Sequence, residues 1–181
     1  MPLKTAFATF RADHPLRAMK VQPANDDQMI QMMPQDGLLD IEPGPSTLLE
    51  PFPEMQSEPR CNESAAEGRM LWVVGQDSMP VAIERGPWGR TLKSGEIKHS
   101  NLSGGRSAHS GGEMWRIKDQ GLLINASSGR YGAESNEELD GVVEILRTMG
   151  FSVASMGFDI DNPTVPNRLA VTDLEWLAAY G

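Results

Sequence analysis

Residues 113–125, Glu-Met-Trp-Arg-Ile-Lys-Asp-Gln-Gly-Leu-Leu-Ile-Asn, decide the fold of this chain. Two apolar runs flank the turn residues Asp, Gln and Gly, and this pattern is typical of an antiparallel hairpin. A second hairpin is predicted upstream, where the apolar runs 70–74 and 80–83 flank the turn residues 76–78. Together the two hairpins indicate a small, mostly antiparallel β-sheet.

A helix is predicted directly after the second hairpin. Ser135-Asn-Glu-Glu138 is a capping box, and Gly150 is a typical helix stop. The apolar residues between them follow helical spacing: Leu139, Val142, Val143, Leu146 and Met149. A strand is expected at 151–153 and a short helix from Thr172. The predicted class is therefore α+β, with one or two helices packed on the sheet and an extended proline-rich N-terminal arm.

The arm is predicted to span residues 1–69 and the globular domain residues 70–181. Residues 1–69 hold nine of the 13 prolines and eleven acidic against six basic residues, so we expect 70–181 to fold without them. Within the arm, 25–33 has a plausible helix cap and several methionines. This segment is interpreted either as a strip packed on the domain or as a docking segment for a chaperone or another partner.

Composition excludes several classes of protein. The net charge of -9 argues against nucleic-acid binding, and no apolar run is long enough to insert into a membrane. The single cysteine, Cys61, excludes an internal disulfide. We find no signal-peptide pattern at the N-terminus, so we expect a soluble protein that is cytoplasmic where it is synthesised.

Residues 94–131 concentrate the side chains that chemistry needs, including His99, His109 and seven glycines. Basic residues lie within and just before this loop. They favour the binding of a small anion such as a nucleotide or phosphorylated metabolite. These basic residues are Arg85, Arg90, Lys93, Lys98 and Arg106. The residues expected to carry catalysis are His99, Glu113 and Tyr131, and those expected to hold the ligand are Ser100, Gly104, Gly105, Arg106 and Arg130. The histidine spacing is too wide to predict a metal site, and no cofactor is identified.

Three short motifs resemble a module of plant IQ-motif calmodulin-binding proteins and related domains of bacterial effectors and polymorphic toxins. They are His99-Ser-Asn101, Ser110-Gly-Gly-Glu113 and Ser128-Gly-Arg-Tyr131, and the resemblance covers roughly residues 94–153. Arg130 stands where that pattern has histidine, and Ala133 where it has proline. The calmodulin-binding IQ motif has no counterpart here, so no calmodulin interaction is implied.

The resemblance leaves two functions open. One is an effector or toxin-like domain with a nucleotide pocket, such as an ADP-ribosyltransferase-like site for NAD, delivered to another cell without a cleavable signal peptide. The other is a non-catalytic interaction module that docks a chaperone, immunity or host protein through its arm or pocket. Whether the protein is an enzyme stays open at this point.

Overall fold

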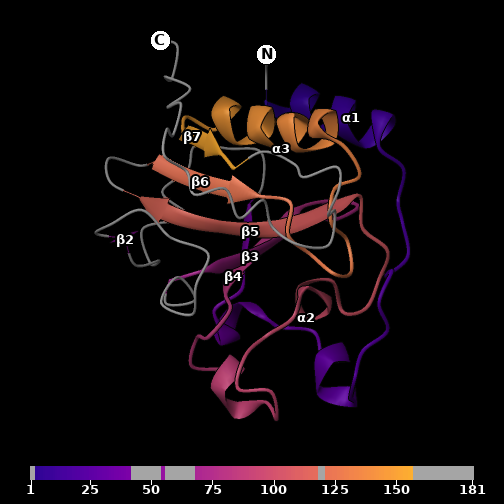
Figure 1. Cartoon of the computed structure of the whole chain (residues 1–181), viewed down its shortest axis with the longest axis vertical. Coiled ribbons are helices and arrows are strands. Elements are labelled where there is room, and N and C mark those ends of the chain that lie inside the picture. The colour runs from indigo at the N-terminus through magenta and orange to yellow at the C-terminus, as the bar shows by residue number, and fades with distance from the viewer. Residues whose placement is uncertain (1–2, 42–53, 56–67, 118–120, 157–181) are drawn as a thin grey trace.

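The computed structural model describes residues 3–41, 54–55, 68–117 and 121–156, and its centre is one seven-stranded sheet (Figure 1). Six strands follow the order β1-β4-β3-β5-β6-β7, and β2 pairs with the far end of β5. The strands are β1 Leu39–Ile41, β2 Glu54–Met55, β3 Met70–Val74, β4 Met79–Ile83, β5 Ser110–Ile117, β6 Gly121–Asn125 and β7 Ser152–Ser155.

Three α-helices lie on the two faces of this sheet. Helices α1 and α3 pack together on one face, and the short α2 lies on the other (Figure 1). Their bounds are α1 Leu3–Asp13, α2 His99–Ser103 and α3 Asn136–Thr148. Single 3-10 turns are η1 Asp26–Met29, η2 Pro34–Asp36 and η4 Gly89–Thr91. The α+β class and the mostly antiparallel sheet are thus confirmed.

Both predicted hairpins are present. Strands β3 and β4 pair antiparallel with Leu71 opposite Ala82, and β5 and β6 pair with Met114 opposite Ile124. Strand β5 begins at Ser110, earlier than predicted, and pairs antiparallel with β3. This pairing joins the two hairpins into one sheet, and the glycine pair 111–112 lies inside it.

The capped helix and the strand after it are also confirmed. The Ser135 hydroxyl accepts a hydrogen bond from the Glu138 amide at 3.2 Å, as an N-cap residue does. Gly150 has a φ of 93°, a left-handed conformation that suits glycine at a helix end. Strand β7 then runs parallel to β6, because α3 carries the chain back across the sheet. The predicted helix from Thr172 lies outside the described residues.

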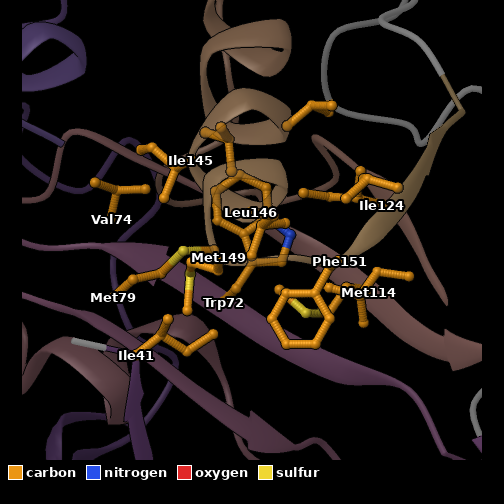
Figure 2. Close-up of a cluster of buried hydrophobic side chains, with 14 of the residues drawn as sticks. Ile41, Trp72, Val74, Met79, Met114, Ile124, Ile145, Leu146, Met149 and Phe151 are labelled. Atoms are coloured by element: carbon orange, nitrogen blue, oxygen red, sulfur yellow. The ribbon is translucent and has the colours of Figure 1, made fainter. Parts of the chain in front are cut away.

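Alternating side chains of the central strands build a core on each face of the sheet. On β3, Trp72 faces α1 and α3, whereas Leu71 and Val73 face α2. Leu146 of α3 lies within the first cluster (Figure 2). The second cluster includes Leu102 of α2 and, from the motifs, Tyr131. The candidate site therefore lies on the α2 face of the sheet.

Within the described part of the predicted arm, α1 packs against α3 over the sheet and β1 joins the sheet. Phe7 and Phe10 of α1 are buried in the same cluster as α3, and Ile41 of β1 is fully buried. The ring of Phe10 lies where a side chain at Gly141 of α3 would stand, 2.7 Å from the ideal Cβ position. The sequence does carry a signal for this helix, because Leu3, Ala6, Phe7 and Phe10 follow helical spacing and no proline lies between residues 3 and 13. Residues 42–53 and 56–67 of the arm lie outside the described residues.

Candidate functional site

His99 begins helix α2 and does not lie in an open loop. It is 7% exposed, and its Nε2 lies 2.9 Å from the Gly112 carbonyl oxygen on β5. Since a carbonyl only accepts hydrogen bonds, Nε2 carries the proton and donates it. One ring nitrogen of His99 is therefore committed to holding α2 on the sheet.

Burial lowers the pKa of His99 from 6.5 to about 4, because the charged imidazolium would lose its hydration. The hydrogen bond to Gly112 opposes this shift, and the nearby cations Arg130, Lys98 and Arg69 add to it. At neutral pH the imidazole is uncharged. It is well suited to packing and to donating one hydrogen bond.

Tyr131 is fully buried, so its ring presents no exposed face to a planar ligand. Its hydroxyl donates to the Arg106 carbonyl oxygen at 2.8 Å and lies 2.9 Å from the Ser103 hydroxyl. An added Cβ at Gly111 would stand 3.1 Å from the Tyr131 Cβ, so glycine is needed for this close packing. The Ser128–Tyr131 turn, predicted to form a surface pocket with the basic glycine-rich loop, meets the 85–112 segment through buried side chains, and the pocket itself stays a prediction.

Gly104 and Gly105, expected to cradle an anion, end helix α2 with φ values of 61° and 75°. Both amides donate to the Ser100 carbonyl oxygen and close the helix. The space beside Gly105 is filled by Met29, whose Cε lies 2.1 Å from an ideal Cβ position, and that beside Gly104 by Gln31. These glycines therefore allow the close approach of the N-terminal segment of the same chain.

The other motif residues of α2 bind that same segment. The Ser100 hydroxyl donates to the Gln28 carbonyl oxygen at 2.5 Å. The Asn101 amide group donates to the carbonyl oxygens of Asp27 and Ile30, both at 2.8 Å. The predicted ligand-binding role of Ser100 has no support in these contacts, since its hydroxyl holds η1 and the residues after it.

Arg130 and Arg106 lie at the edge of the same region. The Arg130 guanidinium donates to the side-chain oxygen of Gln28, and its own carbonyl accepts from the Lys20 amide at 3.0 Å. Burial lowers the pKa of Arg130. Arg106 is exposed, and its Nε donates to the Ser103 carbonyl oxygen at 2.8 Å. Both arginines keep their positive charge at the surface of the site.

Some of the predicted basic loop is neutralised locally. Arg85 and Lys98 both form ion pairs with Glu96, which lowers the pKa of that carboxyl even though burial opposes the shift. Glu96 therefore offsets part of the positive charge of these two residues. They attract an anion less strongly than the sequence pattern indicated.

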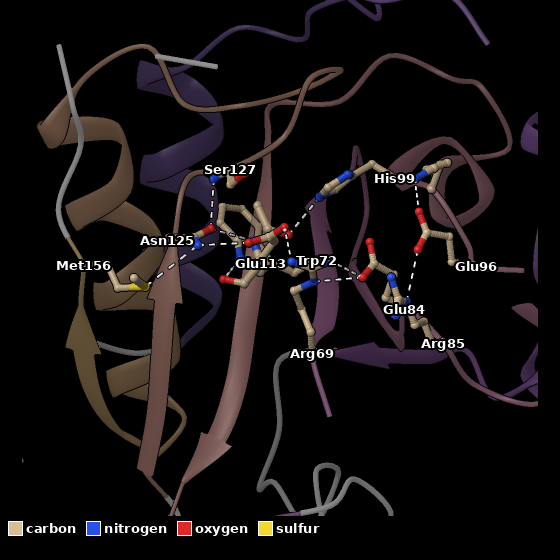
Figure 3. Close-up of polar contacts among 12 residues, drawn as sticks. Arg69, Trp72, Glu84, Arg85, Glu96, His99, Glu113, Asn125, Ser127 and Met156 are labelled. Atoms are coloured by element: carbon tan, nitrogen blue, oxygen red, sulfur yellow. Dashed lines mark hydrogen bonds and ion pairs between the residues drawn. The ribbon is translucent and has the colours of Figure 1, made fainter. Parts of the chain in front are cut away.

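Glu113 belongs to a buried polar network on β5 (Figure 3). Its carboxylate accepts from the Asn125 amide at 3.0 Å and pairs with Arg69 at 3.3 Å. Arg69 also pairs with Glu84, and its backbone carbonyl accepts from the Glu84 amide. Burial raises the pKa of Glu113, although Arg69 and Asn125 oppose the shift.

Sequence reasoning missed Arg69 and Glu84 as members of this network. The signal was present, because Arg69 immediately precedes β3 and Glu84 immediately follows β4. Residues that flank the open end of a hairpin face each other, so a charge pair there is expected. In the described residues no group of histidine, cysteine, aspartate and glutamate side chains is arranged to hold a metal ion.

The structure brings His99, Tyr131 and Gly111 together, and the hydrogen bonds of the His99 Nε2 and of the Tyr131 hydroxyl are made within the protein. No family model, curated protein or solved structure matches this chain. The resemblance to the plant module and to effector domains thus stays a prediction. Across the described ranges, no helix is long and apolar enough to cross a membrane.

Proposed function

We propose that this chain is a non-catalytic protein-interaction module that presents residues 16–33, here called the strip, to a partner protein. One observation carries the proposal. Among the described residues, every large apolar side chain that is well exposed lies on the strip, with exposed fractions from 40% to 51%. They are Leu16, Val21, Met29, Ile30 and Met33. We infer that this concentration of exposed apolar side chains on one segment marks an interaction site.

The way in which the strip is held supports the same function. It has little regular structure of its own, and polar groups of the domain bind its backbone at Arg17, Gln28 and Ile30. These contacts occupy part of the backbone, while five apolar side chains of the strip stay exposed. A segment anchored through its backbone is preorganised for binding, so a partner loses less free energy in ordering it.

The contacts of the residues expected to be catalytic also favour an interaction module over an effector enzyme. His99 holds α2, Tyr131 joins two turns, and Glu113 pairs with Arg69 and Asn125. Each has an internal structural role that accounts for its residue type. We therefore favour the interaction module over the effector enzyme, and a chaperone, immunity or host protein remains the proposed class of partner.

Photo-crosslinking tests this proposal. A benzophenone amino acid is placed at Ile30 on the strip or, as a matched control, at the exposed Gln76 in the β3–β4 turn. We expect one discrete adduct from position 30 in the producing or target cells and none from position 76. A Val21→Ser/Met33→Ser double variant, which changes two well-exposed side chains of the strip, should lose the adduct while keeping the melting temperature within a few degrees, since surface changes cost little stability.

Two results would count against the module. One is equal crosslinking from both positions. The other is turnover or a thermal shift with NAD or a phosphorylated metabolite that His99→Gln abolishes without unfolding the protein. The second result would favour the enzyme.

A further inference from the structure

We propose that the partner presents an acidic amphipathic helix, and that this helix docks on the end of the strip nearest Gly105 and Gly129. This inference rests on the proposed function and names the chemistry of its partner. It follows from an apolar patch and from the charges around it. The exposed side chains of the patch are Val21 and Met29, with Met19 partly buried against the second cluster beside Met29, and the rim consists of Lys20, Arg106 and Arg130.

The apolar patch is built over two glycine turns. Met29 and Met19 both lie beside Gly105, with the Met19 Cε 4.0 Å from the ideal Cβ position there, and Val21 lies 3.9 Å from that of Gly129. The hydrogen bond from the Tyr131 hydroxyl to the Arg106 carbonyl oxygen ties the two turns together. Because glycine has no side chain, the strip lies directly on the turns. Methionine side chains on such a surface adapt to different apolar partners.

The charges at this end of the strip favour an acidic partner. The Lys20 side chain is 44% exposed and pairs with Glu134, and Arg106 is exposed. Within the described part of the chain, no carboxylate forms an ion pair with Arg106 or Arg130. The protein carries a net charge of -9, so a positive rim around an apolar patch runs against its overall composition. Carboxylates on a partner would complement this rim and steer the encounter.

A helix fits this surface better than an added strand. The strip offers no strand of its own as a free edge, because its ladder contact is a single bridge between Arg17 and Ala108. A helix instead presents apolar side chains at positions i and i+4 on one face, with acidic side chains at the margins of that face. An anionic lipid surface would also supply apolar and negative groups. The test below therefore distinguishes binding to lipid from binding to a helix.

The test uses two synthetic helical peptides of about 18 residues with identical leucine faces. One carries glutamate at the flanking positions and the other lysine. Fluorescence anisotropy is measured with the full chain at about 50 mM and about 300 mM NaCl. A third probe is a vesicle of phosphatidylcholine with phosphatidylserine.

We expect the glutamate peptide to bind about tenfold more tightly than the lysine peptide at low salt, and this ratio to shrink at high salt. Met29→Ser should weaken binding of the glutamate peptide about tenfold, and Arg106→Gln several-fold. Lys4→Gln, which removes an exposed cation of α1 on the face of the sheet opposite α2, is the matched control and should leave binding unchanged.

Equal binding of both peptides, binding of neither, or binding of the vesicle alone would overturn the acidic helix. None of these results would remove a discrete crosslink from position 30, so the proposed function is judged separately. Conversely, a glutamate peptide that binds equally to wild type and Met29→Ser would contradict the placement of the helix on this patch.

Discussion

The pH dependence of stability gives a quantitative test of the buried histidine. The pKa of His99 is 6.5 when solvated and about 4 in the folded protein. As pH falls below 6.5, the His99 imidazole binds a proton in the unfolded chain but stays neutral in the folded chain. The free energy of unfolding therefore decreases. The full difference is worth about 3 kcal/mol, and between about pH 7 and about pH 5 the loss is about 2 kcal/mol. His99→Gln removes this dependence.

Urea unfolding of wild type and His99→Gln at the two pH values measures the effect. We expect the variant to be less stable than wild type at neutral pH, and the gap to narrow by about 2 kcal/mol at the lower pH. His109 titrates in both proteins, so its contribution cancels. Proton NMR provides an independent readout, since the His99 ring signal should titrate near 4. Parallel pH profiles, or a ring signal that titrates near 6.5, would refute the buried neutral imidazole.

Further predictions concern the packing around the site. Tyr131→Phe should cost about 1–3 kcal/mol in urea unfolding because buried partners lose a hydrogen bond, and an unchanged midpoint would contradict those bonds. Leu146→Ala should cost about 2–5 kcal/mol by the same measurement, and a cost below that of a surface change would contradict its place in the core. Contrary to the expectation from sequence, residues 70–181 alone should lose cooperative melting in circular dichroism, because α3 would lose its contact with α1. A sharp, full-amplitude transition of this fragment would show that α1 is dispensable.

The elements with strong periodicity could be predicted from sequence. The two hairpins have apolar runs of strand length around clear turns, and α3 has both a capping box and an apolar stripe. Helix α1 was missed because residues 1–69 were interpreted together as one proline-rich arm, although Leu3, Ala6, Phe7 and Phe10 follow helical spacing. A three-residue strand such as β1 carries no periodic signal at all. Its place at the edge of the sheet is set by pairing with β4.

The sequence predicted which segments of the candidate site lie together. It did not predict the structural contacts that their side chains make. The short hairpin between the glycine-rich loop and the Ser128–Tyr131 turn correctly indicated that these two segments meet. Sequence could not show that the space between those segments is filled by residues from the distant N-terminal part. The glycines at 104 and 105 suit an anion and a methionine equally well until the neighbour is known. Only tertiary structure identifies Met29 as that neighbour.

Arg130 is the position at which the chain departs most from the motif that it resembles, and its contacts explain the departure physically. A guanidinium reaches farther than an imidazole and carries several donors. Here it extends from the Ser128–Tyr131 turn to the Gln28 side chain, while its carbonyl accepts from the Lys20 amide. Arginine at this position therefore ties the turn to the strip at two points. Arg130 therefore supplies a tether between the turn and the strip, a contact that the proposed docking module would use to hold the strip in place.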